Sequence, residues 1–196
     1  MRIAKILLTL LFSAAFTVCA ANAQKSNMQN NTESSSSAMA KTSGATTSAD
    51  TKFLRTVGQA DLAEIELGTL AEQKATNPEV KQFAQRMVQD HTKNREELQQ
   101  VAAEQHVTVP DMVTPKDKAT KAQLEKLSGA QFDKAYMNDM LKDHRTDVAE
   151  VAHACKTAEN PAVKSFAQKT LPVLESHLKE AEKVAPQAGA TQSASR

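Results

Sequence analysis

Turn-forming and aromatic residues are scarce in this 196-residue chain, which has five glycines, six prolines, one tyrosine and no tryptophan. A β-sandwich or β-barrel needs frequent turns and strands rich in aromatic and β-branched side chains, so the composition argues against both classes. A charge excess is absent too, because 24 Lys and Arg stand against 23 Asp and Glu. With few aromatics and little net charge, we expect no nucleic-acid partner.

Long apolar runs are also rare. The longest one covers residues 6–18, and its 13 residues are too few to span a bilayer of about 30 Å. Two basic residues precede it and Ala21-Asn22-Ala23 follows it, which is the pattern of a secretory signal peptide over residues 1–23. We expect cleavage after Ala23 and no membrane-spanning segment after signal removal. The expected location is the periplasm, with outer-membrane association or secretion as alternatives.

Cysteine is nearly missing, since the chain has only Cys19 and Cys155. A lipidated Cys19 is an alternative to cleavage after Ala23, but such signals take a small residue directly before the cysteine, where Val18 stands. If Cys19 leaves with the signal, Cys155 has no partner within the chain. The sequence therefore predicts a fold without an internal disulfide.

Composition divides the remaining chain into three parts. Residues 24–50 are rich in Ser, Thr, Asn and Gln and lack the apolar surface that would offset their ordering entropy, so we expect a disordered linker there. Residues 186–196 have the same character and are expected to form a disordered tail. The folded domain is accordingly expected over residues 51–185.

The signals in this domain are typical of an all-α protein. Asn77-Pro78 and Asn160-Pro161 each combine a good N-cap with proline at the first helical position. Thr114 and Ser128 begin sequences typical of capping boxes. Together these signals predict four long helices and a short one in the connection between helices two and three, at about 51–75, 78–105, 116–127, 129–157 and 161–185.

An internal repeat supports this division. Residues 75–86 match residues 158–169 at eight of twelve positions, with an offset of 83. Two similar helical hairpins joined by a longer connection predict a ferritin-like four-helix bundle. The connection is long enough for the ferritin-type crossover but could also loop back, so the sequence leaves the topology open.

Polar residues interrupt the apolar stripes of these helices. Three of the five histidines, His91, His144 and His177, lie on predicted inward faces, and Glu64 shares the apolar stripe of the first helix. Asp61 occupies the repeat position of His144. Buried polar groups cost several kcal/mol unless they have partners, so these side chains are expected to converge.

Two interpretations of the convergence remain. In the first, the histidines are neutral core residues that hydrogen-bond Glu64, Asp147, Asn94 and water and fix the helix register. In the second, Glu64, His91, His144 and His177 bind a transition metal at a mononuclear site. Glu-x-x-His, the motif of di-iron bundles, is absent from the core stripes, which argues against oxygen-activating di-iron chemistry.

The axial positions of the histidines bear on the second interpretation. His91 follows Asn77 by 14 residues, and His144 and His177 lie 16 and 17 residues from Asn160. At about 1.5 Å per residue, all three lie some 21–26 Å from their turns. They are level if both turns share one end of the bundle, whereas a crossover could displace His91 by several Å.

Several short motifs resemble the bacterial domain of unknown function 4142. They are Ala63-Glu64-Ile65-Glu66-Leu67-Gly68, Asn77-Pro78, Asp90-His91, Phe132-Asp133-Lys134-Ala135-Tyr136-Met137, Asp143-His144 and Leu171-Pro172 with His177. The resemblance covers about residues 51–184 and implies a ferritin-like four-helix bundle in exported bacterial proteins, often labelled as outer-membrane proteins. The family's motif glutamate and histidines correspond to Glu64, His91, His144 and His177, and no activity comes with the resemblance.

No motif of an enzyme is present, neither a nucleophile elbow, a phosphate-binding glycine loop, Cys-x-x-Cys nor His-Glu-x-x-His. The working hypothesis is an exported helical-bundle protein without enzymatic activity, linked to envelope stress, with envelope proteins or further copies of itself as partners. The alternative is a protein that binds or oxidises a transition metal at the four residues above. A third hypothesis is a scaffold that holds envelope partners through the linker or a helix face.

Overall fold

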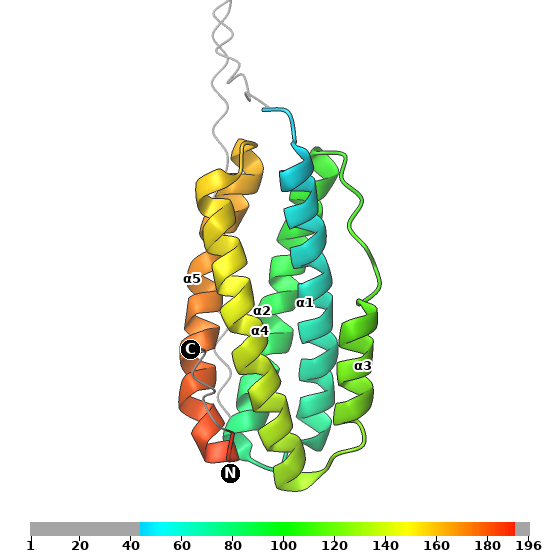
Figure 1. Ribbon diagram of the computed structural model, residues 1–196, viewed down its shortest axis with the longest axis vertical. Helices are drawn as coiled ribbons and strands as arrows, with labels where there is room; N and C mark the ends of the chain where they lie inside the picture. Colours follow the sequence, from blue (N-terminus) through cyan, green and yellow to red (C-terminus); the bar gives the residue numbers. More distant parts are fainter. Residues whose placement is uncertain (1–43, 191–196) are drawn as a thin grey trace, which may run out of the picture. The chain divides into compact units, whose positions relative to one another are not determined.

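The computed structural model describes residues 44–190, which form five α-helices and a final turn of 3-10 helix, with no β-strand in that range (Figure 1). The expected all-α class is confirmed. The predicted signal peptide, most of the expected linker and residues 191–196 lie outside the described residues. The elements are α1 (Ser48–Lys74), α2 (Pro78–Glu104), α3 (Pro115–Leu124), α4 (Gly129–Thr157), α5 (Pro161–Val184) and η1 (Ala185–Ala188).

The four long helices close into a ring. Helix α1 contacts α2 and α4, and α5 contacts the same two helices from the opposite side. Residues 75–77 join α1 to α2 at one end, and residues 158–160 join α4 to α5 at the other (Figure 1). The connection from α2 to α4 therefore runs back along the helices, and its α3 packs on the outside against α1 and α4 (Figure 1).

Side-chain caps begin most of the helices. The Asn77 and Asn160 side chains accept backbone N–H bonds at the starts of α2 and α5, as predicted. Thr114 caps α3 in the same way. The predicted capping box at Ser128 is wrong, since its side chain makes no cap hydrogen bond. Gly129, with φ of +57°, enters α4 in the left-handed region, and that geometry is incompatible with a capping box.

The folded part is longer than residues 51–185. Helix α1 begins at Ser48 because Thr47 and Asp50, inside the expected linker, form a reciprocal capping box. At the other end, Ala188 and Ala190 are buried against the core, although both lie in the expected tail. A boundary drawn from composition misses these residues, because single alanines in a polar segment can still be buried against the core.

The sequence repeat has a structural counterpart at the two turns. The Asp133 carboxylate, near the start of α4, accepts the backbone N–H groups of Thr76 and Asn77 at 3.0 and 2.9 Å. Asp50, 83 residues earlier near the start of α1, accepts the N–H of Asn160 at 3.2 Å. Each hairpin turn is thus anchored by an aspartate from the other hairpin.

Candidate functional site

A polar layer crosses the middle of the helix ring. Two apolar clusters fill the core on either side of it, one around Phe83, Met137 and Met140 and the other around Leu54, Leu98 and Phe166. The layer between them contains nearly fully buried side chains from all four long helices. They are Asp61, Glu64, His91, His144, Thr170 and His177.

The three histidines form the centre of this layer. Their ring centroids are 5.3–5.7 Å apart, and one nitrogen from each ring lies within 4.8 Å of the other two. They come from α2, α4 and α5, so the site depends on the packing of three separate helices. No other group of three such ligand residues within residues 44–190 is close enough to hold a metal ion.

One nitrogen of each ring is already occupied. Nδ1 of His91 lies 2.8 Å from Oδ1 of Asp61, and Nε2 of His177 lies 2.8 Å from Oδ2 of Asp90. Nδ1 of His144 lies 3.0 Å from the carbonyl oxygen of Met140. All three partners are acceptors, so each of these nitrogens carries the proton of a neutral ring.

The second nitrogen of each ring is buried and has no hydrogen-bond partner among the described residues. These atoms are Nε2 of His91, Nε2 of His144 and Nδ1 of His177. With the proton on the other nitrogen, each of them carries a free lone pair. Three buried imidazoles that approach one another within 4.8 Å through one nitrogen each, and that each keep a free lone pair, form a ligand set of the kind that binds a transition metal.

Burial disfavours the charged form of two of these rings, those of His144 and His177. Burial lowers the pKa of His177 to about 4, and the proximity of the His91 ring lowers it further. Burial, together with His91 and His177, also lowers the pKa of His144 well below its usual value. A proton therefore does not compete for the lone pairs of His144 and His177 at neutral pH.

A second layer of side chains orients the histidines. The Asn94 amide donates to both oxygens of Asp61 at 3.1 and 2.9 Å, and the Thr170 hydroxyl donates to the Asn94 oxygen at 2.8 Å. On the other side, Asp90 pairs with Arg86 at 3.2 Å. Carboxylates that hold the outer nitrogen of a histidine are the usual second layer of metal sites.

Glu64 lies beside this trio rather than within it. Its Oε1 is 4.0 Å from Nδ1 of His144, the nitrogen that already donates to Met140, and its Oε2 is buried without a partner. Burial raises the pKa of Glu64 well above its usual value, and the acidic residue Asp147 raises it further. Its environment therefore favours the protonated, neutral form of the carboxyl.

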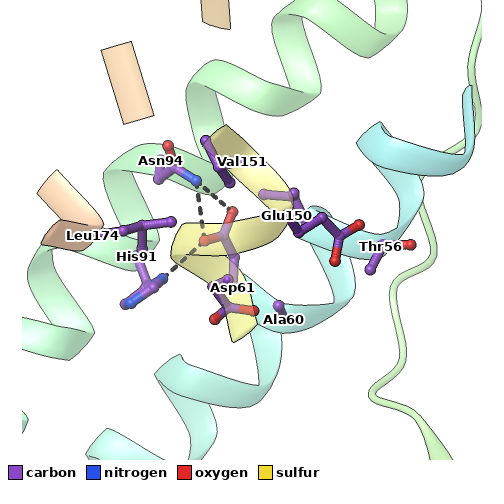
Figure 2. A pocket seen from close by; sticks show the side chains of 10 residues that line it. Thr56, Ala60, Asp61, His91, Asn94, Glu150, Val151 and Leu174 are labelled. Carbon is purple, nitrogen blue, oxygen red and sulfur yellow. Dashed lines mark hydrogen bonds and ion pairs between the residues drawn. The ribbon is translucent and has the colours of Figure 1, made fainter. Parts of the chain in front are cut away.

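A pocket between α1 and α4 reaches the polar layer (Figure 2). Half-buried Thr56, Ala60, Asp147 and Glu150 form its outer part, while buried Asp61 and His91 are among its inner lining. Figure 2 shows Asp61 in the centre, bonded to His91 and Asn94, with Glu150 on the side away from His91.

Sequence reasoning placed His91, His144 and His177 on inward faces, and the structure brings the three together. It was wrong about their partners, because none of the rings hydrogen-bonds Glu64, Asp147 or Asn94. The rings hydrogen-bond Asp61, Asp90 and a backbone carbonyl instead. Pairing of His177 with Asp90 depends on how α2 and α5 are placed side by side, which no spacing within one helix reveals.

The expected displacement of His91 under a crossover does not occur. The two turns lie at opposite ends, and yet the three histidines are together (Figure 1). Each lies some 21–26 Å from its turn in helices about 40 Å long, so each is near the middle of its helix. A position near the middle is level with its neighbours whichever end the turn occupies.

None of the helices described between residues 44 and 190 combines the length and apolar character that crossing a bilayer requires. Three solved structures have a similar fold. A DUF305 fragment from Deinococcus radiodurans has a TM-score of 0.66 at 14% identity, covering 74% of this chain and 99% of that one. A DUF305 protein from Streptomyces coelicolor, inferred to be secreted, has a TM-score of 0.64 at 19% identity, covering 76% and 97%.

The third similar structure is CopM in its Cu(II)-bound form, with a TM-score of 0.60 at 17% identity, covering 70% of this chain and 96% of that one. At such identities the likeness shows a shared fold alone. No curated protein matches the sequence at a significant level. The profile of the domain of unknown function DUF4142, however, matches residues 34–184. Since this match covers most of the sequence, the chain belongs to the DUF4142 family.

Proposed function

We propose that this protein binds one transition-metal ion in the middle of its helix ring, through His91, His144 and His177. One observation carries the proposal: each buried ring donates through one nitrogen and keeps a buried, unpartnered lone pair on the other. An unpaired buried polar atom costs about 1–3 kcal/mol, and here three lie together. A bound cation would satisfy all three at once.

The residue types favour copper or zinc. Imidazole nitrogen suits Zn, Cu, Fe and Ni, whereas Mg and Ca take oxygen ligands. Metal–nitrogen bonds of about 2.0–2.1 Å require nitrogens roughly 3.4 Å apart in a tetrahedral site. Nitrogens within 4.8 Å of one another reach that spacing by small side-chain rotations. The similarity to CopM, solved with Cu(II), supports testing copper first.

In this proposal Glu64 stands next to the ion without ligating it in the resting arrangement. Its carboxyl is on the Nδ1 side of His144, while the free lone pair is on Nε2. Unlike Asp61, which is held by His91 and Asn94, Glu64 is a buried carboxyl near the trio that could become a ligand if its side chain rotates. The proposal thus keeps all four residues of the sequence hypothesis and gives the three histidines the principal role.

We also propose that the fold is a ferritin-like four-helix bundle with a short extra helix in the connection. The support is the long connection between two antiparallel hairpins whose turns lie at opposite ends (Figure 1). An exported, periplasmic location is proposed on the predicted signal peptide and on the similar Streptomyces protein inferred to be secreted.

The experiment is metal-dependent melting of the mature chain, purified without a histidine tag. Cu or Zn present at 100 times the dissociation constant should stabilise the native state by about 2.7 kcal/mol, which corresponds to roughly 5–10 °C in a domain of this size. The double variant His144→Leu, His177→Leu should show no shift and no bound metal.

The matched control is His106→Leu, His153→Leu, because both of those histidines are exposed. It should bind one ion per chain with the same shift as the unchanged protein. Absence of any thermal shift with Cu, Zn, Fe, Ni or Mn in the unchanged protein would refute the proposal and leave the core histidines with a structural role.

A further inference from the structure

The polar layer communicates with solvent on two sides, and the charges on those sides differ. On the α2–α5 side, the half-exposed Asp90 touches His177, but Arg86 is bonded to Asp90 and also pairs with Glu180. The guanidinium thus already occupies the carboxylate that contacts His177 and competes with an approaching cation for it. The α1–α4 side has the pocket of Figure 2 and no such arginine among its lining residues.

That pocket is lined by carboxylates at successive depths. Glu150 and Asp147 lie at the half-buried outer part, and Asp61 lies at the buried inner part in contact with His91. His91 also lines the pocket; its Nδ1 bonds Asp61 and its Nε2 is buried and unpartnered, so the pocket ends at a ligand residue of the proposed site.

The acidic residues here are not neutralised by salt bridges. Asp147 and Glu150 make no ion pair or hydrogen bond with the other described residues, although Lys52 acts on Glu150 at longer range and Lys116 pairs with the neighbouring Asp143. Burial raises the pKa of Asp147 to about 7; Asp143, Glu150 and Asp61 contribute to the rise, and His91 opposes it. Neighbouring carboxylates without a bonded cation attract a metal ion from solution, and Asp147 contributes most above pH 7, where it is ionised.

We infer that the pocket between α1 and α4 is the route by which the metal ion enters the histidine site, and that Asp147 and Glu150 draw the cation in and pass it to Asp61 and His91. This inference rests on the proposed metal binding. The carboxylates contact the metal ion transiently and do not bind it stably, because within residues 44–190 only the histidines are grouped closely enough to hold an ion.

The route predicts a kinetic defect without a comparable loss of affinity. In the full mature chain, Zn²⁺ uptake from a chromophoric chelator is followed by stopped flow at low ionic strength. The variant Asp147→Asn, Glu150→Gln should lower the association rate constant by at least tenfold, within the range of electrostatic steering. Its dissociation rate constant should fall in parallel, so that the equilibrium affinity changes less than threefold.

Two further variants make the test specific. Glu97→Gln, Glu180→Gln removes the same charge from the α2–α5 side, where Glu97 lines a surface hollow with α5 residues and Glu180 pairs with Arg86, and should leave the association rate within twofold of the unchanged protein. Ala60→Leu narrows the pocket without changing its charge and should also slow uptake, while equilibrium loading of one ion per chain shows that the variant is folded.

The outcomes separate the route from the site. Zn²⁺ uptake by the unchanged protein, with equal association rates in the Asp147→Asn, Glu150→Gln and Ala60→Leu variants, would overturn the route and leave the histidine site in place. A slower association rate in the α2–α5 control alone would place the entrance on that side and would also overturn the proposed route. Failure of the unchanged protein to take up metal at equilibrium would overturn both the site and the route.

Discussion

Nδ1 of His91 lies 2.8 Å from Oδ1 of Asp61, and both side chains are almost completely buried. A carboxylate can only accept, so this contact places the ring proton on Nδ1 and frees the lone pair of Nε2. Asn94 and Thr170 hold the carboxylate in turn. A single aspartate on α1 thus decides which nitrogen of a histidine on α2 is able to bind a metal.

Asp61→Asn tests this control of the tautomer. The amide retains the shape of the carboxylate but can donate to Nδ1, which moves the ring proton to Nε2 and removes the lone pair. We expect metal affinity to fall by about 10–100-fold, as for other second-layer changes, measured by competition with a chelator. Asp111→Asn, at an exposed position, is the control. Affinity within threefold of the unchanged protein would show that Asp61 does not set the tautomer.

His144→Leu separates a metal site from a structural histidine. His144 is fully buried with Nε2 unpartnered, and its Nδ1 bonds only a backbone carbonyl within α4. Replacement by leucine removes an unsatisfied polar atom, so we expect the free energy of unfolding in a chelator to rise by about 1 kcal/mol. Urea denaturation measures it, with exposed His153→Leu as control. A loss of more than about 1 kcal/mol would favour a structural role.

Asp147→Asn should change how stability depends on pH. Burial raises the pKa of Asp147 to about 7 in the folded protein, while an unfolded aspartate titrates near 3.9. The folded state therefore holds this proton more tightly, and the associated stability is present below about pH 4 and lost as the pH rises through 7. Asparagine does not titrate, so the Asp147→Asn variant does not lose this stability as the pH rises.

We accordingly expect Asp147→Asn to gain stability relative to the unchanged protein between pH 5 and pH 8, by on the order of 2 kcal/mol. Urea midpoints at both pH values, in the presence of chelator, measure the difference. Exposed Asp111→Asn should show no such trend. A gain that is constant with pH would mean that Asp147 ionises normally in the folded protein.

Gly68→Ala tests the close approach of α1 to α2. A Cβ atom at Gly68 would lie 2.8 Å from Cγ2 of Val88 and 3.2 Å from the carbonyl oxygen of Ala84. Alanine favours a helix by about 1 kcal/mol over glycine, yet overpacking costs about 1–3 kcal/mol. We expect a net loss of about 1 kcal/mol in urea denaturation, whereas exposed Thr69→Ala should be near neutral. A net gain would show that the helices separate easily.

Asp133→Asn tests the anchoring of the first hairpin turn. The carboxylate accepts the N–H groups of Thr76 and Asn77 and the Thr76 hydroxyl, and an amide cannot replace all three bonds. We expect the free energy of unfolding to fall by about 2 kcal/mol. Asp50→Asn should cost less, because Asp50 accepts only two backbone N–H groups, that of Asn160 in the equivalent turn and that of Thr47 in the capping box, both at 3.2 Å. Equal losses in the two variants would contradict the ranking.

Local sequence signals were enough to predict the helices and to place the three histidines on inward-facing sides of those helices. The Asn-Pro pairs define the starts of α2 and α5 because capping and the fixed φ of proline act within a few residues. Helical spacing places His91, His144 and His177 on apolar stripes because the period of 3.6 residues is a property of each helix alone. The all-α class follows from the same local information.

Only the tertiary structure decided which polar groups meet. The pairing of His177 with Asp90, the position of Glu64 outside the histidine trio and the acidic pocket between α1 and α4 depend on how helices are placed side by side. The offset and rotation of one helix against another result from packing many apolar side chains at once. Those side chains are far apart in the sequence, so no short-range pattern predicts the result. The sequence by itself thus determined the helices and the inward polar residues, and packing determined the site.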